Sequence, residues 1–290
     1  MPTFHCKLNK NINGFQINLY EVDLNDTDQF QRLQDYIKNK IKSMKVHDGA
    51  KHVYQYLSIP NIPKAFADKL IERINQINTP VTAPKSWFDV RRSRATEFMS
   101  QLLLEREYNC IFYEEADKRI NVTPVNVDKH APGIDVPGIL LDGNTFKFIV
   151  CEVKASKDEK IPCASSSELL EDIKKGYFNK NERLSKEILE YISQMSKVNT
   201  GDEVIKNVIQ FLIDLIHDSD SQGKILEKVV FFPFLIRNNA KIVENKNLDD
   251  FVDFKIDDLK GINLTGIIWS FNQDIDTFCN NLYNEVLAGA

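Results

Sequence analysis

The chain has 290 residues and a formal charge of −5, with 42% hydrophobic and 27% charged residues. This ordinary globular composition excludes wholesale disorder, and the length holds one large domain or two smaller ones. The 11 glycines and 10 prolines exclude fibrous and low-complexity classes, and the amino-terminal residues lack the apolar core of a signal peptide. No run of about 18 uncharged apolar residues is present, so we expect a soluble, cytoplasmic protein with no membrane partner.

Charge is spread unevenly along the chain. Residues 242–290 carry nine acidic side chains against three basic ones, whereas residues 85–94 hold four basic side chains and one acidic one. The net negative charge argues against a general nucleic-acid coat. Candidates for contacts with DNA phosphates are nevertheless present, and they are Arg91, Arg92, Arg94 and Lys157. The alternative is that the arginines lie on a helix surface and pair with acidic side chains.

The first 84 residues are typical of a small α+β unit. The pattern predicts a strand over Phe15–Val22, a helix capped by Thr27 and a second helix over Ala65–Ile77. Four prolines between residues 60 and 84 end this unit. We therefore expect a boundary near residue 84, with residues 1–84 forming an accessory or partner-docking unit.

Residues 85–290 show the order of elements of an α/β domain. The first elements are a helix over Phe88–Glu105, a strand over Cys110–Tyr113, and two strands, Gly138–Leu141 and Thr145–Lys154, joined by a hairpin turn at residues 142–144. The elements that follow are helices over 166–177, 184–195 and 202–217, strands over 228–236 and 264–271, and a helix over 274–287. Their sum predicts a sheet covered by helices on both faces.

The strand that ends at Lys154 carries charge inside an apolar run. Successive side chains of a strand point to opposite faces, so Glu152 and Lys154 share one face. Burying such charges is costly unless they are paired or bind a metal. The hairpin register should also bring Asp135, which precedes the first hairpin strand, beside Glu152. Two carboxylates suit an octahedral Mg²⁺, and a nearby lysine can position water or stabilise charge on a phosphate.

These residues resemble the motifs of the PD-(D/E)XK nuclease superfamily. Asp135 is followed after sixteen residues by Glu152-Val153-Lys154, and the preceding helix bears Glu97. The resemblance covers residues 88–160, and residues 160–271 by element order only. It departs from the usual Pro-Asp motif, because Gly133-Ile134 precedes Asp135.

The resemblance implies a fold and a set of roles. The expected fold is a restriction-endonuclease-like αβββαβ core, with a mixed central sheet flanked by helices, over residues 85–290. Asp135 and Glu152 would ligate Mg²⁺, for which Mn²⁺ substitutes, and Glu97 would complete the metal shell. Lys154 would act as the catalytic base or as an electrostatic stabiliser. The implied activity is phosphodiester hydrolysis in DNA.

More narrowly, the layout is similar to that of the HamA-type nuclease subunits of the Hachiman anti-phage defence system. The shared features are a small amino-terminal unit, an arginine-rich lead into a helix bearing a glutamate, a Gly-x-Asp motif and a Cys-Glu-x-Lys strand end. This similarity implies a helicase partner that restrains or delivers the nuclease. Two alternatives stay open: an inactive module of the same fold for DNA binding or partner docking, and an interaction protein built around the acidic tail.

Overall fold

The computed structural model describes residues 1–43, 85–112, 134–142, 145–177, 227–238, 247–252 and 262–288, and the single positions 65, 68, 69, 191, 206 and 210. The helices within these residues are α1 (Thr27–Ser43), α4 (Lys85–Glu107), α6 (Ala164–Tyr177), α10 (Ile275–Ala288) and the short 3-10 helix η1 (Asn247–Phe251). The strands are β1 (His5–Ile12), β2 (Phe15–Glu21), β3 (Cys110–Ile111), β4 (Val136–Asp142), β5 (Thr145–Ser156), β6 (Val229–Asn238) and β7 (Asn263–Phe271). No helix in these ranges is both long enough and apolar enough to cross a membrane.

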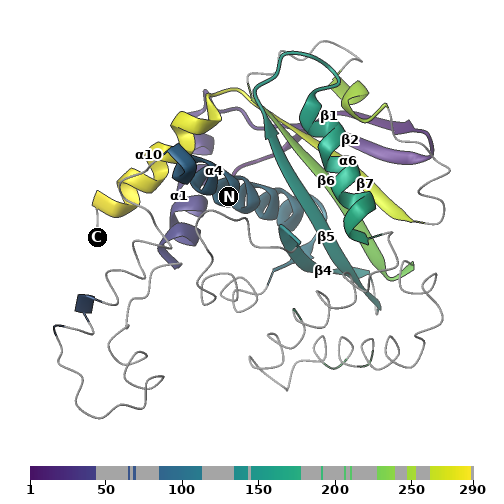
Figure 1. Cartoon of the computed structure of the whole chain (residues 1–290), viewed down its shortest axis with the longest axis horizontal. Coiled ribbons are helices and arrows are strands. Elements are labelled where there is room, and N and C mark those ends of the chain that lie inside the picture. The colour runs from purple at the N-terminus through teal and green to yellow at the C-terminus, as the bar shows by residue number, and fades with distance from the viewer. Residues whose placement is uncertain are drawn as a thin grey trace.

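The described strands form one mixed sheet in the order β1-β2-β7-β6-β5-β4-β3 (Figure 1). Strands β2, β7, β6 and β5 run parallel to one another, whereas β1, β4 and β3 run antiparallel to their neighbours. All ten residues of β6 are buried, as is typical of a central parallel strand. Its ladder with β7 is interrupted at Phe232 and Pro233, because proline has no N–H to donate. The predicted α/β class is therefore confirmed.

Helices cover both faces of this sheet. The first face carries α1, α4 and α10, and the second carries α6 and η1 (Figure 1). Strand β5 supplies both cores by strict alternation: Ile149 and Cys151 pack on the α4 face, and Phe148 and Val150 on the α6 face. Glu152 and Lys154, further along β5, thus follow an alternation that the core fixes.

Residues 1–43 belong to the main sheet and its core. Strand β2 pairs in parallel with β7, from Gln16 opposite Thr265 to Glu21 opposite Ser270. The ring of Phe4 packs edge-on against Trp269, with 5.0 Å between the ring centroids. The boundary predicted near residue 84 and the helix predicted over 65–77 fall outside the described residues. The described part of the expected accessory unit nevertheless shares one sheet with the rest of the chain.

Two local features of this region differ from the sequence-based expectations. Strand β1 is not predicted, because its side chains are mostly exposed and polar and therefore show no apolar alternation. Helix α1 is capped by Asp26 instead of Thr27, since Oδ1 of Asp26 accepts the backbone N–H of Asp28 at 2.9 Å and of Gln29 at 3.3 Å. An acidic side chain one position earlier thus takes the capping role.

The elements predicted after residue 85 are present wherever the structure describes them. Helices α4, α6 and α10 and strands β4 to β7 lie within a few residues of their predicted bounds, while β3 is shorter than predicted and ends at Ile111. The helices predicted over 184–195 and 202–217 lie outside the described residues, apart from isolated positions. The periodic patterns of the sequence were therefore reliable guides to this half of the sheet.

Candidate active site

The β4–β5 hairpin brings two carboxylates together. Val136 pairs with Cys151 at the end of the ladder, so the preceding residue, Asp135, lies beside Glu152, and the two side chains interact through a hydrogen bond. The backbone N–H of Val153 also donates to Oδ2 of Asp135 at 2.8 Å. The prediction that the hairpin register makes Asp135 and Glu152 meet is confirmed.

Glu97 approaches this pair from α4. Its side chain is buried, and it accepts hydrogen bonds from the Ser93 hydroxyl at 3.1 Å and from Nη1 of Arg94 at 2.8 Å. Both donors lie one helical turn earlier, at the spacing that places side chains on one helix face. Glu97 is also close enough to Asp135 for the charge of Asp135 to act on it. The helix thus presents its glutamate to the end of the hairpin.

Burial governs the ionisation of two of these acids. Desolvation raises the pKa of Glu97, opposed by the charge of Arg94 and reinforced by that of Asp135. Desolvation likewise raises the pKa of Asp135, although the N–H of Val153 and the ammonium of Lys154 act in the opposite direction. Negative charge is therefore unfavourable at this place, and a bound cation would relieve it.

The donor atoms fit a hard divalent cation. Carboxylate oxygens are the ligands that Mg²⁺ prefers, and Asp135 and Glu152 supply two adjacent carboxylates. Across the residues that the structure describes, no group of three or more His, Cys, Asp or Glu side chains is gathered closely enough to hold a metal ion. Mg²⁺ held by two carboxylates takes its remaining ligands from water and substrate.

Lys154 lies next to these acids on β5. Its Nζ forms an ion pair with Oδ2 of Asp172 on α6, at 2.8 Å, and its side chain is about one-third exposed. Burial alone would lower the pKa of Lys154, but the ion pair with Asp172, aided by Asp135 and Glu152, raises it above the usual value. Lys154 is therefore a charged ammonium at neutral pH, beside an acidic pair.

The arginines proposed for DNA contact lie in different environments. Arg91 is 3% exposed, its guanidinium lies 5.4 Å from the ring centroid of Tyr283, and it donates to Asn284 at 3.3 Å. This arginine belongs to the contact between α4 and α10. Arg94 lies nearer the hairpin and pairs with Glu97 at 2.8 Å. The arginines on α4 are therefore not gathered on one exposed face.

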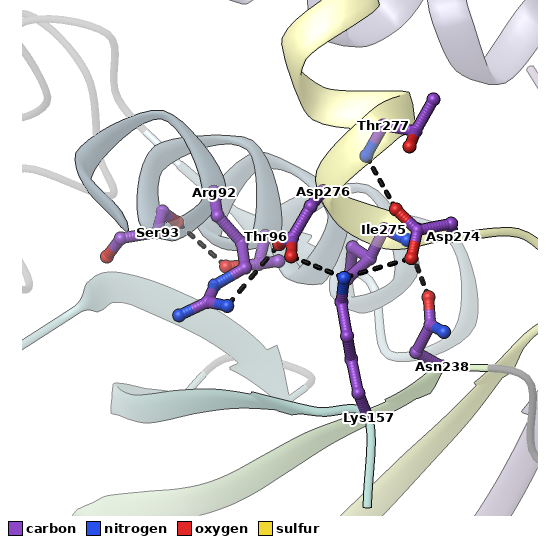
Figure 2. A network of polar contacts seen from close by, with 9 residues as sticks. All are labelled: Arg92, Ser93, Thr96, Lys157, Asn238, Asp274, Ile275, Asp276 and Thr277. Atoms are coloured by element: carbon purple, nitrogen blue, oxygen red, sulfur yellow. Dashed lines mark hydrogen bonds and ion pairs between the residues drawn. The ribbon is translucent and has the colours of Figure 1, made fainter. Parts of the chain in front are cut away.

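Arg92 and Lys157 both contact the acidic start of α10 (Figure 2). Nη1 of Arg92 lies 3.3 Å from Oδ1 of Asp276. Nζ of Lys157 lies 2.9 Å from Oδ2 of Asp274 and also pairs with Asp276. This network ties the end of β5 to α4 and α10. Both cations are thus paired with acids, which is the alternative that the sequence left open for the arginines.

Sequence reasoning missed one further charged pair near the site. Nε of Arg237, at the end of β6, lies 3.4 Å from Oδ2 of Asp250 in η1, and both side chains are almost fully buried. Oδ1 of Asp250 accepts the backbone N–H of Cys163 at 2.8 Å, yet burial outweighs both partners and raises the pKa of Asp250. An arginine after an apolar strand was a visible signal, but the acidic tail offered many possible partners.

Asp172 was also missed as a neighbour of the site. It lies within a helix whose sequence shows an apolar stripe and several acids, and nothing local distinguishes this acid from Glu168 or Glu171. Only the packing of α6 on β5 brings Asp172, and not another acid of this helix, to Lys154.

No family model, curated protein or solved structure matches the chain.

Proposed function

We propose that the protein is a metal-dependent DNA nuclease that hydrolyses phosphodiester bonds at Asp135, Glu152 and Lys154. The observation that carries the proposal is the contact between the partly buried carboxylate of Asp135 and the buried carboxylate of Glu152 at the end of the β4–β5 hairpin. Lys154 lies two residues from Glu152 on the same strand face. Placing like charges together away from water destabilises the fold. A bound cation would neutralise the two carboxylates, and the phosphate of a substrate would pair with the lysine.

The order of the described elements supports the proposal. From α4 to β6 the described elements are a helix, three strands, a helix and a strand. The resemblance to the PD-(D/E)XK superfamily implies this αβββαβ order. Glu97 lies on the first of these helices, and the Glu152–Lys154 pair lies near the end of the third strand, as the resemblance also implies.

The residues of the chain divide the chemistry among them. A divalent cation held by Asp135 and Glu152 would polarise the phosphate and lower the pKa of a bound water. The Val153 N–H fixes the Asp135 carboxylate, and Glu97, whose carboxylate is held by Ser93 and Arg94, would accept a hydrogen bond from water at the site. The Lys154 ammonium would donate to a non-bridging phosphate oxygen, where negative charge grows as water attacks in line and the bond to the leaving oxygen breaks. The proton that the water loses passes to solvent, and the leaving oxygen takes up a proton from solvent.

A second protein is part of the proposal. The chain carries a formal charge of −5, and Arg92, Arg94 and Lys157 are each paired with an acid. DNA affinity in the isolated chain is therefore expected to be weak. We infer that a helicase subunit supplies it in an anti-phage defence assembly, as the narrower resemblance implies, and that residues 1–84 contribute to the docking.

Plasmid cleavage tests the proposal directly. Wild type, Lys154→Ala and the control Lys160→Ala are compared at low salt in Mg²⁺ and in Mn²⁺. We expect wild type and the control to cut, and Lys154→Ala to be at least about 100-fold slower with an unchanged melting temperature, because it loses one donor to the developing charge. Equal rates for wild type and Lys154→Ala would overturn the assigned chemistry.

If the wild-type chain does not cleave the plasmid, a second measurement is needed, because a missing partner and an inactive site give the same result in a cleavage assay. Mn²⁺ binding to the isolated chain separates the two cases. Binding that Asp135→Asn abolishes would indicate a restrained enzyme. The absence of binding would favour the alternative, an inactive module of the same fold.

A further inference from the structure

The feature that carries a further inference is the ion pair between β5 and α6. Oδ2 of Asp172 lies 2.8 Å from Nζ of Lys154. On α6, Leu169 and Ile173 are buried against the sheet, at the positions three before and one after Asp172. The backbone of Asp172 is therefore held by the packing of its neighbours, and its carboxylate approaches β5 from a fixed direction.

The Lys154 ammonium has no fixed position without a partner such as Asp172. The side chain of a lysine is a flexible stem of four carbons, and its ammonium is a compact point charge with no preferred orientation. Glu152 lies two residues away on the same strand face, which is about 6.6–6.8 Å along the backbone and within reach of a lysine side chain. Asp135 lies beside Glu152. Without Asp172, the ammonium of Lys154 would form ion pairs with the carboxylates of Asp135 and Glu152.

We propose that Asp172 is a positioning residue of the nuclease site, which holds the Lys154 ammonium against α6 and keeps it from competing with a divalent cation for Asp135 and Glu152. This inference rests on the proposed function. Asp172 contacts neither the cation nor the phosphate; it acts through Lys154. Its removal therefore impairs metal binding as well as turnover.

The alternative is an ordinary surface ion pair. Both side chains are partly exposed, at 32% for Lys154 and 44% for Asp172, and pairs of this kind contribute little to stability. Loss of the pair should then leave melting temperature, metal affinity and cleavage almost unchanged. A readout that depends on where the ammonium goes separates the two interpretations.

The test measures Mn²⁺ affinity by titration of the full chain, with Mn²⁺ alone as the probe. The variants are Asp172→Asn, Asp172→Glu, Lys154→Met and the double variant Asp172→Asn/Lys154→Met. The control is Glu168→Gln, an exposed acid one turn earlier on α6. We expect Asp172→Asn to weaken Mn²⁺ binding by about 10-fold or more, and Asp172→Glu and the control to stay near wild type.

The double variant is decisive. If the released ammonium is the competitor, Lys154→Met in the Asp172→Asn background restores Mn²⁺ affinity to at least the wild-type value. A merely structural role for Asp172 would not be reversed by removing Lys154. Unchanged Mn²⁺ affinity in Asp172→Asn, or a double variant that binds as weakly as Asp172→Asn, overturns the inference.

Cleavage by the same variants gives a second, independent arm. Asp172→Asn should cut about 10–100-fold more slowly than wild type, and should have no additional effect in the Lys154→Met background, because it acts through that lysine. If wild type binds Mn²⁺ and cuts while Asp172→Asn behaves identically, the inference fails and the proposed function stands. If wild type neither binds Mn²⁺ nor cuts, the proposed function fails and the inference with it.

Discussion

The backbone N–H of Val153 donates to the carboxylate of Asp135 across the end of the β4–β5 hairpin, at 2.8 Å. This bond means that Asp135 is oriented by the sheet and not by a loop. A donor on the backbone cannot be lost by side-chain substitution. The carboxylate can therefore be changed to an amide, whose oxygen still accepts the bond, to isolate the effect of its charge.

Asp135→Asn should abolish stabilisation by metal while keeping the fold. A ligand that binds only the native state stabilises it by about 2.7 kcal/mol at a concentration 100 times its Kd. We therefore expect saturating Mn²⁺ to raise the melting temperature of wild type and of Glu168→Gln by several degrees, and not that of Asp135→Asn. Differential scanning fluorimetry measures this, and an equal shift in all three proteins would place the metal elsewhere.

Asp274 should make a pH-dependent contribution to stability through the cap of α10. Its Oδ1 accepts the backbone N–H of Thr277 at 2.8 Å, and this bond, followed by the ion pair with Lys157, lowers the pKa of Asp274 to about 2. The folded pKa lies below the unfolded one, so the stabilisation is complete above the unfolded pKa of about 3.9. It is lost as the pH falls towards 2.

Asp274→Ala should accordingly lower the free energy of unfolding by about 1 kcal/mol at pH 7, and by less as the pH approaches 2. Asp274→Asn separates the two contributions, because asparagine caps helices well but carries no charge. Urea unfolding between pH 7 and pH 2.5 measures both variants. A difference between wild type and Asp274→Asn that does not shrink with falling pH would contradict the assignment.

Asp276 should restrain the two cations that it contacts. Arg92 and Lys157 both pair with it, so Asp276→Asn makes them more available to DNA phosphates. We expect DNA to bind several-fold more tightly at low salt, with a salt dependence steeper by up to about 0.9 per cation released. Glu285→Gln is the matched control, since it removes the same charge from α10 but pairs with Lys38. Equal salt dependence in both variants would show that Arg92 and Lys157 do not contact DNA.

Phe4 should affect the stability of the whole sheet, although it precedes the first strand, β1. It is buried beside Tyr20 and Trp269, so Phe4→Ala should cost about 3–5 kcal/mol. Hydrogen exchange should then speed up together in β2, β7 and β6, because they share one ladder. Faster exchange confined to β1 and β2 would instead indicate an amino-terminal unit that unfolds separately.

Local patterns in the sequence predicted the parts of the fold that depend on local geometry. Alternation along β5 and the turn signal that the sequence shows at residues 142–144 predict the hairpin register, so the contact of Asp135 with Glu152 could be predicted from the sequence alone. The helix bearing Glu97 was also predicted, although its sequence shows little apolar periodicity, because residues 95–104 are buried on every side of the helix.

Contacts between distant elements were beyond this reasoning. The partners of Lys154, Lys157 and Arg237 come from α6, α10 and η1. Asp172 and Asp276 are partly exposed acids with other acids nearby in the sequence, whereas Asp250 is buried. Which acid faces which base depends on how the helices pack on the sheet. The pairing of β2 with β7 likewise joins the two ends of the sequence, and no local pattern records it.

The pairing of β2 with β7 also constrains the order in which the protein can be completed during synthesis. β2 leaves the ribosome long before β7. Until β7 emerges, β2 and the largely apolar β6 each keep one unpaired edge, the kind of surface on which nascent chains associate. The β4–β5 hairpin with its acids can pair with β6 well before that moment. A nascent chain that stalls before β7 would therefore carry Asp135 and Glu152 side by side on a sheet whose β2 and β6 edges are still unpaired.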